Sequence, residues 1–197
     1  DRFLPERWPA YFKEAKGCYI YDLDDNKYTD MTIMGVGTNI LGYANKIIDN
    51  AVSARIKKGN ITTLNCTEEV DLAKKLIHMH PWADKVRFAR SGGEANSIAI
   101  RLARASTNKH NIAFCGYHGW HDWYLAANLK SKKNLGNHLI EGLKIGGVNK
   151  GLKDTIYPFK YNDFNGLKKI VEKHNIGIIK MEVIRDIPPK NNFLKKI

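Results

Sequence analysis

The chain has few of the features that mark a membrane-bound or disulfide-stabilised protein. It contains only three cysteines, Cys18, Cys66 and Cys115, in 197 residues, and no Cys-x-x-Cys pair. An odd, widely spaced set of this kind excludes a disulfide framework and indicates reduced thiols. No run approaches the roughly 18 apolar residues of a membrane span, and the first residues show no signal-peptide pattern. We therefore expect a cytoplasmic protein without a membrane partner.

Acidic residues are scarce as well, since 20 Asp and Glu stand against 32 Lys and Arg, giving a net charge of +12. Basic proteins often bind nucleic acid or anionic surfaces. Here the lysines are spread in short groups, such as 130–133 and 168–169, and no basic helix collects them. We favour a charge due to general composition and expect no nucleic-acid partner. A non-catalytic basic binding module is the alternative.

Short β-rich runs alternate with amphipathic helices along the chain. The pattern predicts a hairpin over 17–34, and then strands over 86–90, 111–115 and 176–184 and helices over 45–58, 68–80, 94–105 and 164–174. A polar, glycine-rich stretch at about 128–153 is too long for an ordinary connection and suggests a mobile lid. The alternation predicts an α/β fold with a mostly parallel sheet flanked by helices.

The stretch "VRFARSGGEANSIAIRLARA", residues 86–105, turns from a strand pattern into a helix pattern at two glycines. A helix amino terminus offers unpaired N–H donors and a partial positive charge, which suit a phosphate group. Gly92 and Gly93 would let an anion approach these donors without an intervening β-carbon. Ser91 and Glu94 also form a capping-box pattern, which needs no ligand.

The turn "CGYHGWHDWY", residues 115–124, gathers aromatic and imidazole side chains after a predicted strand. An aromatic ring here could stack on a flat ligand. His118, His121 and Asp122 could instead bind a metal, which would indicate a metal-dependent hydrolase. The plainest interpretation is a packed turn whose histidines bond to nearby backbone.

Two carboxylates, Glu182 and Asp186, follow the last predicted strand. Ligands of parallel sheets bind beyond the carboxyl ends of the strands, so Glu182 would share a site with Ser91 and Tyr117. A simple pair between Glu182 and Lys180, which lies two residues earlier on the same face, is the alternative.

Taken in order, these segments resemble the class III, fold type I, pyridoxal-phosphate aminotransferases, and among them the glutamate-1-semialdehyde 2,1-aminomutase group. The resemblance runs over nearly the whole chain and is carried by "GCYIYDLDDNKYTDM", "NILGY", "EEVDLAKKL", "SGGEA", "CGYHGWHD", "YNDFNGLKKIV" and "IGIIKMEVI". It implies the PLP-dependent transferase fold, with 1–45 as an amino-terminal segment containing the hairpin and 46–197 as part of an incomplete large cofactor-binding domain.

The resemblance also implies a pyridoxal 5'-phosphate site. Ser91, Gly92 and Gly93 would receive the phosphate, Tyr117 would stack on the pyridine ring with His118 beside it, and Glu182 would line the cofactor pocket; no metal is implied. Three positions depart from the family pattern. Gly93 replaces a threonine, so that a backbone contact to the phosphate must take the place of a hydroxyl contact. Val36 replaces an aromatic residue of the substrate-site wall, and Val183 replaces a proline.

The implied activity is amino-group transfer, either between a small-molecule donor and acceptor (aminotransferase) or within one molecule (aminomutase), in a homodimer. Both chain ends look cut, because the chain starts at Asp1 and ends one turn into a predicted helix. The Schiff-base lysine and the aspartate that pairs with the pyridine nitrogen are expected beyond Ile197, so the catalytic residues are unknown here. We expect residues 1–197 alone to be inactive.

Overall fold

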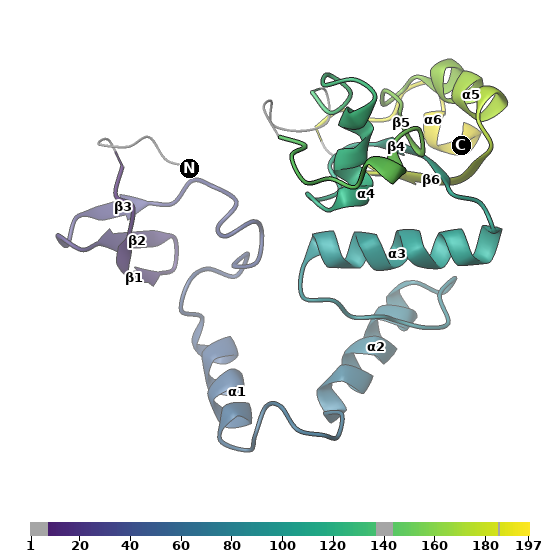
Figure 1. The fold of residues 1–197 in the computed structure, drawn as a ribbon. Helices are drawn as coiled ribbons and strands as arrows, with labels where there is room; N and C mark the ends of the chain where they lie inside the picture. The colour runs from purple at the N-terminus through teal and green to yellow at the C-terminus, as the bar shows by residue number, and fades with distance from the viewer. Residues whose placement is uncertain (1–7, 137–143, 185) are drawn as a thin grey trace. The chain divides into compact units, whose positions relative to one another are not determined.

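The computed structural model describes residues 8–136, 144–184 and 186–197, so that residues 137–143 of the predicted lid lie outside the described residues. The chain divides into two compact units, residues 1–86 and 87–197 (Figure 1). The predicted boundary between 45 and 46 falls inside the first unit and stays a prediction. Among the described residues, no helix combines the length and the apolar character needed to cross a membrane.

The first unit contains a small antiparallel sheet. Its strands, in the order β1-β2-β3, are β1 (Phe12–Lys16), β2 (Tyr19–Asp22) and β3 (Lys27–Thr29). The predicted hairpin is confirmed as β2 and β3, and Asp22 fixes its turn by accepting hydrogen bonds from the amides of Asp24 and Asn26, both at 2.9 Å. The prediction missed β1, which lies before the glycine where the hairpin was placed.

Two helices complete the first unit, and they confirm the helices predicted over 45–58 and 68–80. Helix α1 (Lys46–Ile56) starts at Asn45, whose side chain accepts from the amides of Ile47 and Ile48, and α2 (Thr67–Met79) ends just before Pro81. An Asn cap and a proline after the last turn are the usual limits of a helix. Within the described residues neither helix has a fully buried side chain.

The second unit is built on a parallel sheet in the order β5-β4-β6, which confirms the predicted sheet type. Strand β4 (Asn111–Cys115) lies in the centre, between β5 (Ile156–Pro158) and β6 (Ile176–Met181). The helical segments around it are α3 (Gly92–Thr107), α4 (Asp122–Leu125), η1 (Ala126–Leu129), η2 (Lys150–Leu152), α5 (Phe164–Lys173) and α6 (Phe193–Lys196).

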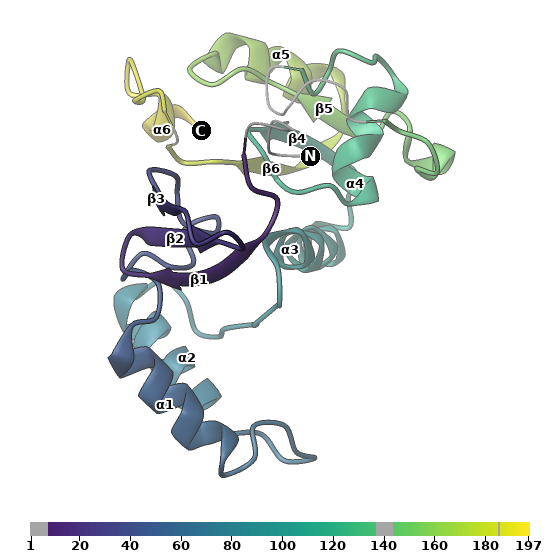
Figure 2. The ribbon, with the colours of Figure 1, turned by 90° about the vertical axis from the view of Figure 1, so that its left-hand side faces the viewer.

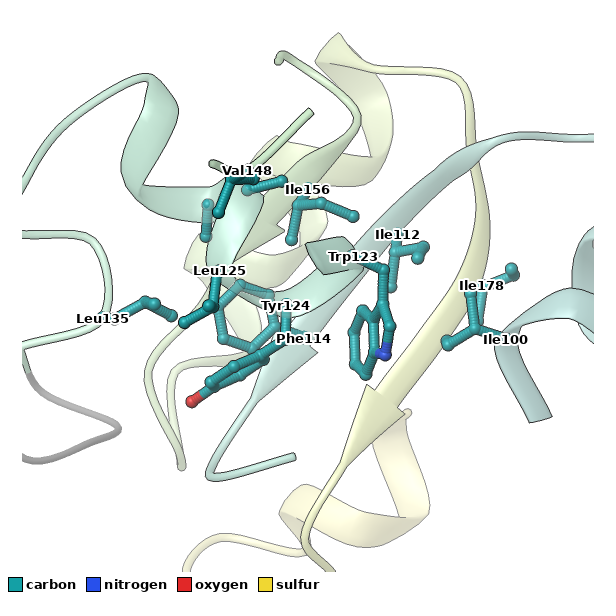
Figure 3. Packing of buried hydrophobic residues seen from close by; sticks show 12 residues of the cluster. Ile100, Ile112, Phe114, Trp123, Tyr124, Leu125, Leu135, Val148, Ile156 and Ile178 are labelled. Carbon is teal, nitrogen blue, oxygen red and sulfur yellow. The ribbon is translucent and has the colours of Figure 1, made fainter. Parts of the chain in front are cut away.

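Alternate residues of β4 enter two separate hydrophobic cores, as expected for a central strand. On one side Ile112 and Phe114 pack with Ile100 of α3 and with α4 and η1; Figure 3 shows these side chains around Tyr124. On the other side Ala113 and Cys115 pack with α5 and α6. Helices α3 and α5 therefore cover opposite faces of the sheet (Figure 1), and Figure 2 views α3 nearly along its axis below β4 and β6.

Three predictions for the second half need correction. Residues 86–90 do not form a strand, because no described strand lies beside them to bond their backbone. The predicted strand 176–184 ends at Met181. The described parts of 128–153 are not a free lid, since Leu135 and Val148 are only 2% and 8% exposed within the core.

Candidate functional site

Helix α3 begins at Gly92, two residues earlier than the sequence pattern placed it, with Ser91 as its cap. The Ser91 hydroxyl accepts from the Glu94 amide at 3.2 Å, and the Glu94 carboxylate accepts from the Arg90 amide at 2.8 Å. The capping interaction considered as the alternative is thus present. It leaves the first two helical amides unused, because no described residue accepts a hydrogen bond from Gly92 or Gly93.

The two glycines of α3 have different surroundings. A β-carbon on Gly92 would meet no atom within 4 Å, so the space beside its Cα is open. A β-carbon on Gly93 would lie 2.9 Å from both Cδ2 and Nε2 of His121. Gly119 has φ +95°, and a β-carbon there would lie 2.9 Å from the Gly93 Cα. The turn after β4 therefore crosses the start of α3 at a distance that only two glycines permit.

Tyr117 and His118 are adjacent in this turn but have opposite environments. The Tyr117 side chain is 42% exposed, and its ring contacts Tyr124 edge-on at a centroid distance of 6.2 Å. His118 is only 2% exposed, with Nε2 2.9 Å from the carbonyl oxygen of Cys115. Tyr117 thus presents an open aromatic face, whereas His118 holds the turn against the core.

Glu182 lies where β6 ends and joins the same turn. Its amide donates to the Cys115 carbonyl at 3.1 Å, and its Oε1 accepts from the Tyr117 amide at 3.3 Å. Gly116, at φ +96°, makes room for it, because a β-carbon there would lie 2.8 Å from Glu182 Cγ. The parallel register of β4 and β6 therefore brings Tyr117 and Glu182 together, as predicted; Asp186 lies further on and is exposed.

Burial and charge act together on the ionisable groups beside Glu182. Burial lowers the pKa of Lys180, and the Glu182 carboxylate acts in the opposite direction, so the two side chains interact. Burial, and secondly the Glu182 carboxylate, raises the pKa of the Cys115 thiol from 9.0 to about 11. Cys115 is 4% exposed and stays protonated in the folded chain at neutral pH.

The raised pKa of Cys115 predicts a loss of stability in alkali. Between the unfolded pKa of 9.0 and the folded value of about 11, the unfolded chain releases a proton that the folded chain keeps. The free energy of unfolding should therefore fall by about 1 kcal/mol more in the wild type than in Cys115→Ala between pH 8 and 10. Urea unfolding at both values measures this, with exposed Cys18→Ala as the matched control. Equal falls in wild type and Cys115→Ala would contradict it.

The metal site proposed from His118, His121 and Asp122 does not form. Nε2 of the buried His118 is hydrogen-bonded to the Cys115 carbonyl oxygen, and Nδ1 of His121 lies 2.7 Å from the Ser97 hydroxyl. In the part of the chain that the structure describes, no three His, Cys, Asp or Glu side chains gather as metal ligands. The histidines instead tie the turn together, which was the plainest interpretation.

Sequence reasoning missed the residues of α3 that hold this turn. Asn96 donates through Nδ2 to the His118 carbonyl at 3.3 Å, and Ser97 bonds His121. Their spacing carried the signal, since Gly93, Asn96, Ser97 and the buried Ile100 lie on one helix face. Polar residues next to an apolar one on that face indicate a contact with backbone or imidazole groups. Ser97 and His121 also line a hollow of about 390 Å³.

The fold is that of part of a fold type I pyridoxal-phosphate enzyme. The sequence profile of the class-III aminotransferases matches residues 5–152, and the chain belongs to this family of pyridoxal-phosphate-dependent enzymes. It is 36% identical over 86% of its length to 3-aminobutyryl-CoA aminotransferase of Cloacimonas acidaminovorans. It is 38% identical over 98% of its length to glutamate-1-semialdehyde 2,1-aminomutase of Francisella tularensis.

Solved structures agree with this assignment. An omega-transaminase from Sphaerobacter thermophilus superposes with a TM-score of 0.81 at 26% identity, covering 97% of this chain and 45% of that one. A glutamate-1-semialdehyde-aminomutase from Pseudomonas aeruginosa gives 0.73 at 18% identity, over 96% and 42% of the two chains, and shares the fold. The chain spans 37% and 45% of the two curated relatives, less than half of either.

Proposed function

We propose that the protein to which these residues belong transfers amino groups with pyridoxal 5'-phosphate, and that the turn at 116–121 with the start of α3 forms its cofactor site. The observation that carries the proposal is the convergence of three kinds of group. Unused helix amides at Gly92 and Gly93, the open ring of Tyr117 and the carboxylate of Glu182 meet around one turn. The family and the relatives support the same chemistry.

The residues present fit such a cofactor. A phosphate suits the amino end of a helix, and Gly92 has open space where a side chain would otherwise block the approach. A conjugated ring suits the exposed face of Tyr117. When bound, the cofactor supplies an aldehyde for the substrate amine and a ring that withdraws electrons from it. This chain would supply the binding and orientation, with Ser91, Gly92 and Gly93 toward the phosphate.

Glu182 and His118 support the site rather than react in it. The Glu182 carboxylate fixes the Tyr117 amide and places a negative charge beside the ring position, and it would line the cofactor pocket. His118, buried between β4 and the aromatic rings of α4, keeps the turn in one conformation. Both roles orient Tyr117.

Tyr117 offers a direct test of the cofactor site. Tyr117→Ala should weaken binding of pyridoxal phosphate about 10-fold, because the stacking surface is lost, whereas Tyr117→Phe keeps the ring and should bind within about 2-fold of wild type. Equilibrium dialysis and visible absorption measure both dissociation constants. The control is Tyr161→Phe, which removes a tyrosine hydroxyl outside the proposed site. That hydroxyl donates a hydrogen bond to the carbonyl oxygen of Val183. Unchanged binding in Tyr117→Ala would refute the site.

The substrate and assembly belong to the same proposal. The two curated relatives named above are an aminotransferase and an aminomutase, so both outcomes of amino transfer are represented. Val36, in place of an aromatic wall, argues against glutamate-1-semialdehyde as the substrate. We infer a homodimer acting in the cytoplasm on a small-molecule amino donor and acceptor; assay of the whole protein with a panel of amino donors separates the two activities.

A further inference from the structure

We propose that His121 binds the phosphate of the cofactor through Nε2, as a side-chain donor that takes the place of a side chain at position 93. The inference rests on the proposed function and deepens it. Its starting point is that Gly93 has no side chain to bind the phosphate, so that only a backbone contact was expected at this position. The structure instead offers an imidazole at that place.

The position of the His121 ring is the first step of the argument. Nε2 and Cδ2 both lie 2.9 Å from the point that a β-carbon of Gly93 would occupy. The ring edge therefore fills the space of a side chain rooted in the first turn of α3. An Nε2–H there is a donor next to the Gly92 and Gly93 amides, which have no acceptor among the described residues.

The orientation of the ring is fixed from its other nitrogen. Nδ1 lies 2.7 Å from the hydroxyl of Ser97, one helical turn after Gly93. When the hydroxyl donates to Nδ1, the proton of a neutral imidazole resides on Nε2; in the imidazolium form both nitrogens carry protons. Both of these forms present Nε2–H as a donor toward the amino end of α3, whereas a neutral ring with its proton on Nδ1 would donate to Ser97 and leave Nε2 as an acceptor; the proposal requires the ring to carry its proton on Nε2. Ser97 is thus a positioning residue for His121.

The surroundings leave the ring accessible to a ligand. His121 is partly exposed and borders the hollow of about 390 Å³ that Ser97, Trp120, Asp122 and Trp123 also line. The Trp120 ring lies edge-on to it at a centroid distance of 5.5 Å. The nearby Glu94 carboxylate is occupied by the Arg90 amide. A dianionic phosphate is therefore the group that would accept hydrogen bonds from the Gly92 and Gly93 amides and from Nε2–H of His121.

The test compares pyridoxal phosphate with pyridoxal, which lacks the phosphate, as ligands of the whole protein. His121→Ala should weaken pyridoxal phosphate about 10- to 100-fold, the effect of one charge-assisted hydrogen bond, and change pyridoxal binding by less than about 2-fold. Inorganic phosphate should compete with pyridoxal phosphate in the wild type and compete less in His121→Ala. The exposed His110→Gln, at the other end of α3, is the matched control and should match wild type.

A double variant tests the exchange of side chains directly. Gly93→Ser alone should bind poorly, because its β-carbon meets the imidazole. Gly93→Ser combined with His121→Ala vacates that space and supplies a hydroxyl there, and should recover most of the lost affinity for pyridoxal phosphate.

The outcomes separate the inference from the proposed function. If His121→Ala loses equal affinity for pyridoxal phosphate and for pyridoxal, the residue only holds the turn. That result, or unchanged binding of both ligands, overturns the inference about His121 but leaves the proposed function standing. A double variant no better than His121→Ala counts against the exchange of side chains. If the wild type binds neither ligand, the inference and the proposed function both fail.

Discussion

Gly119→Ala should lower the free energy of unfolding by about 2 to 6 kcal/mol. The backbone at Gly119 has φ +95°, which costs an alanine about 1 to 3 kcal/mol. The added methyl group would also lie 2.9 Å from the Gly93 Cα, and forcing two backbone segments apart costs about 1 to 3 kcal/mol more. Urea unfolding of the purified protein measures the change, and binding of pyridoxal phosphate should be lost with it.

Gly92→Ala is the matched control for this substitution. It lies at the same crossing of the turn and α3, but a β-carbon there meets nothing within 4 Å and the backbone is helical. Its stability should stay within about 0.5 kcal/mol of wild type. If Gly119→Ala is as stable as Gly92→Ala, the turn moves freely away from α3. The proposed cofactor site would then not be held in a fixed geometry by this contact.

Phe114→Ala should cost about 3 to 5 kcal/mol, the range for removing a buried phenyl ring. Phe114 is 0% exposed and lies at the centre of the core between α3 and the sheet. Its ring contacts Tyr124 edge-on at 5.1 Å, and the two rings lie side by side in Figure 3. Thermal or urea unfolding measures the loss.

Phe88→Ala provides the comparison in the same unit. Phe88 is 39% exposed and belongs to neither buried cluster, so its truncation should cost less than about 1 kcal/mol. Similar costs for the two variants would mean that β4 does not carry the core of this unit.

Local features of the fold followed from the sequence because local chemistry decides them. Asn45 and Asp163 cap helices that begin within one residue of their predicted starts at 45 and 164, and Pro81 follows the end of α2. The alternation of strands and helices predicted the parallel sheet around β4. The grouping of Tyr117 with Glu182 followed from the rule that carboxyl ends of parallel strands share one edge.

Features that depend on a distant partner did not follow from the sequence. Strand β5 has three residues and includes Pro158, so it has too little pattern to be recognised without β4 beside it. Residues 86–90 have a strand pattern but no neighbouring strand among the described residues. The contact between Gly93 and His121 joins positions 28 residues apart, and nothing in either motif specifies it.

The order of the strands in the chain sets the time at which this unit can fold during synthesis. Strand β4 lies in the middle of its sheet, yet both of its neighbours are made later, β5 at 156–158 and β6 at 176–181. When β4 leaves the ribosome, Ile112 and Phe114 have α3 to pack against but no strand to bond. About 60 further residues must emerge before the pairing with β6 can begin. Until then the nascent chain exposes an aggregation-prone strand, and a chaperone that shields it would protect the growing protein.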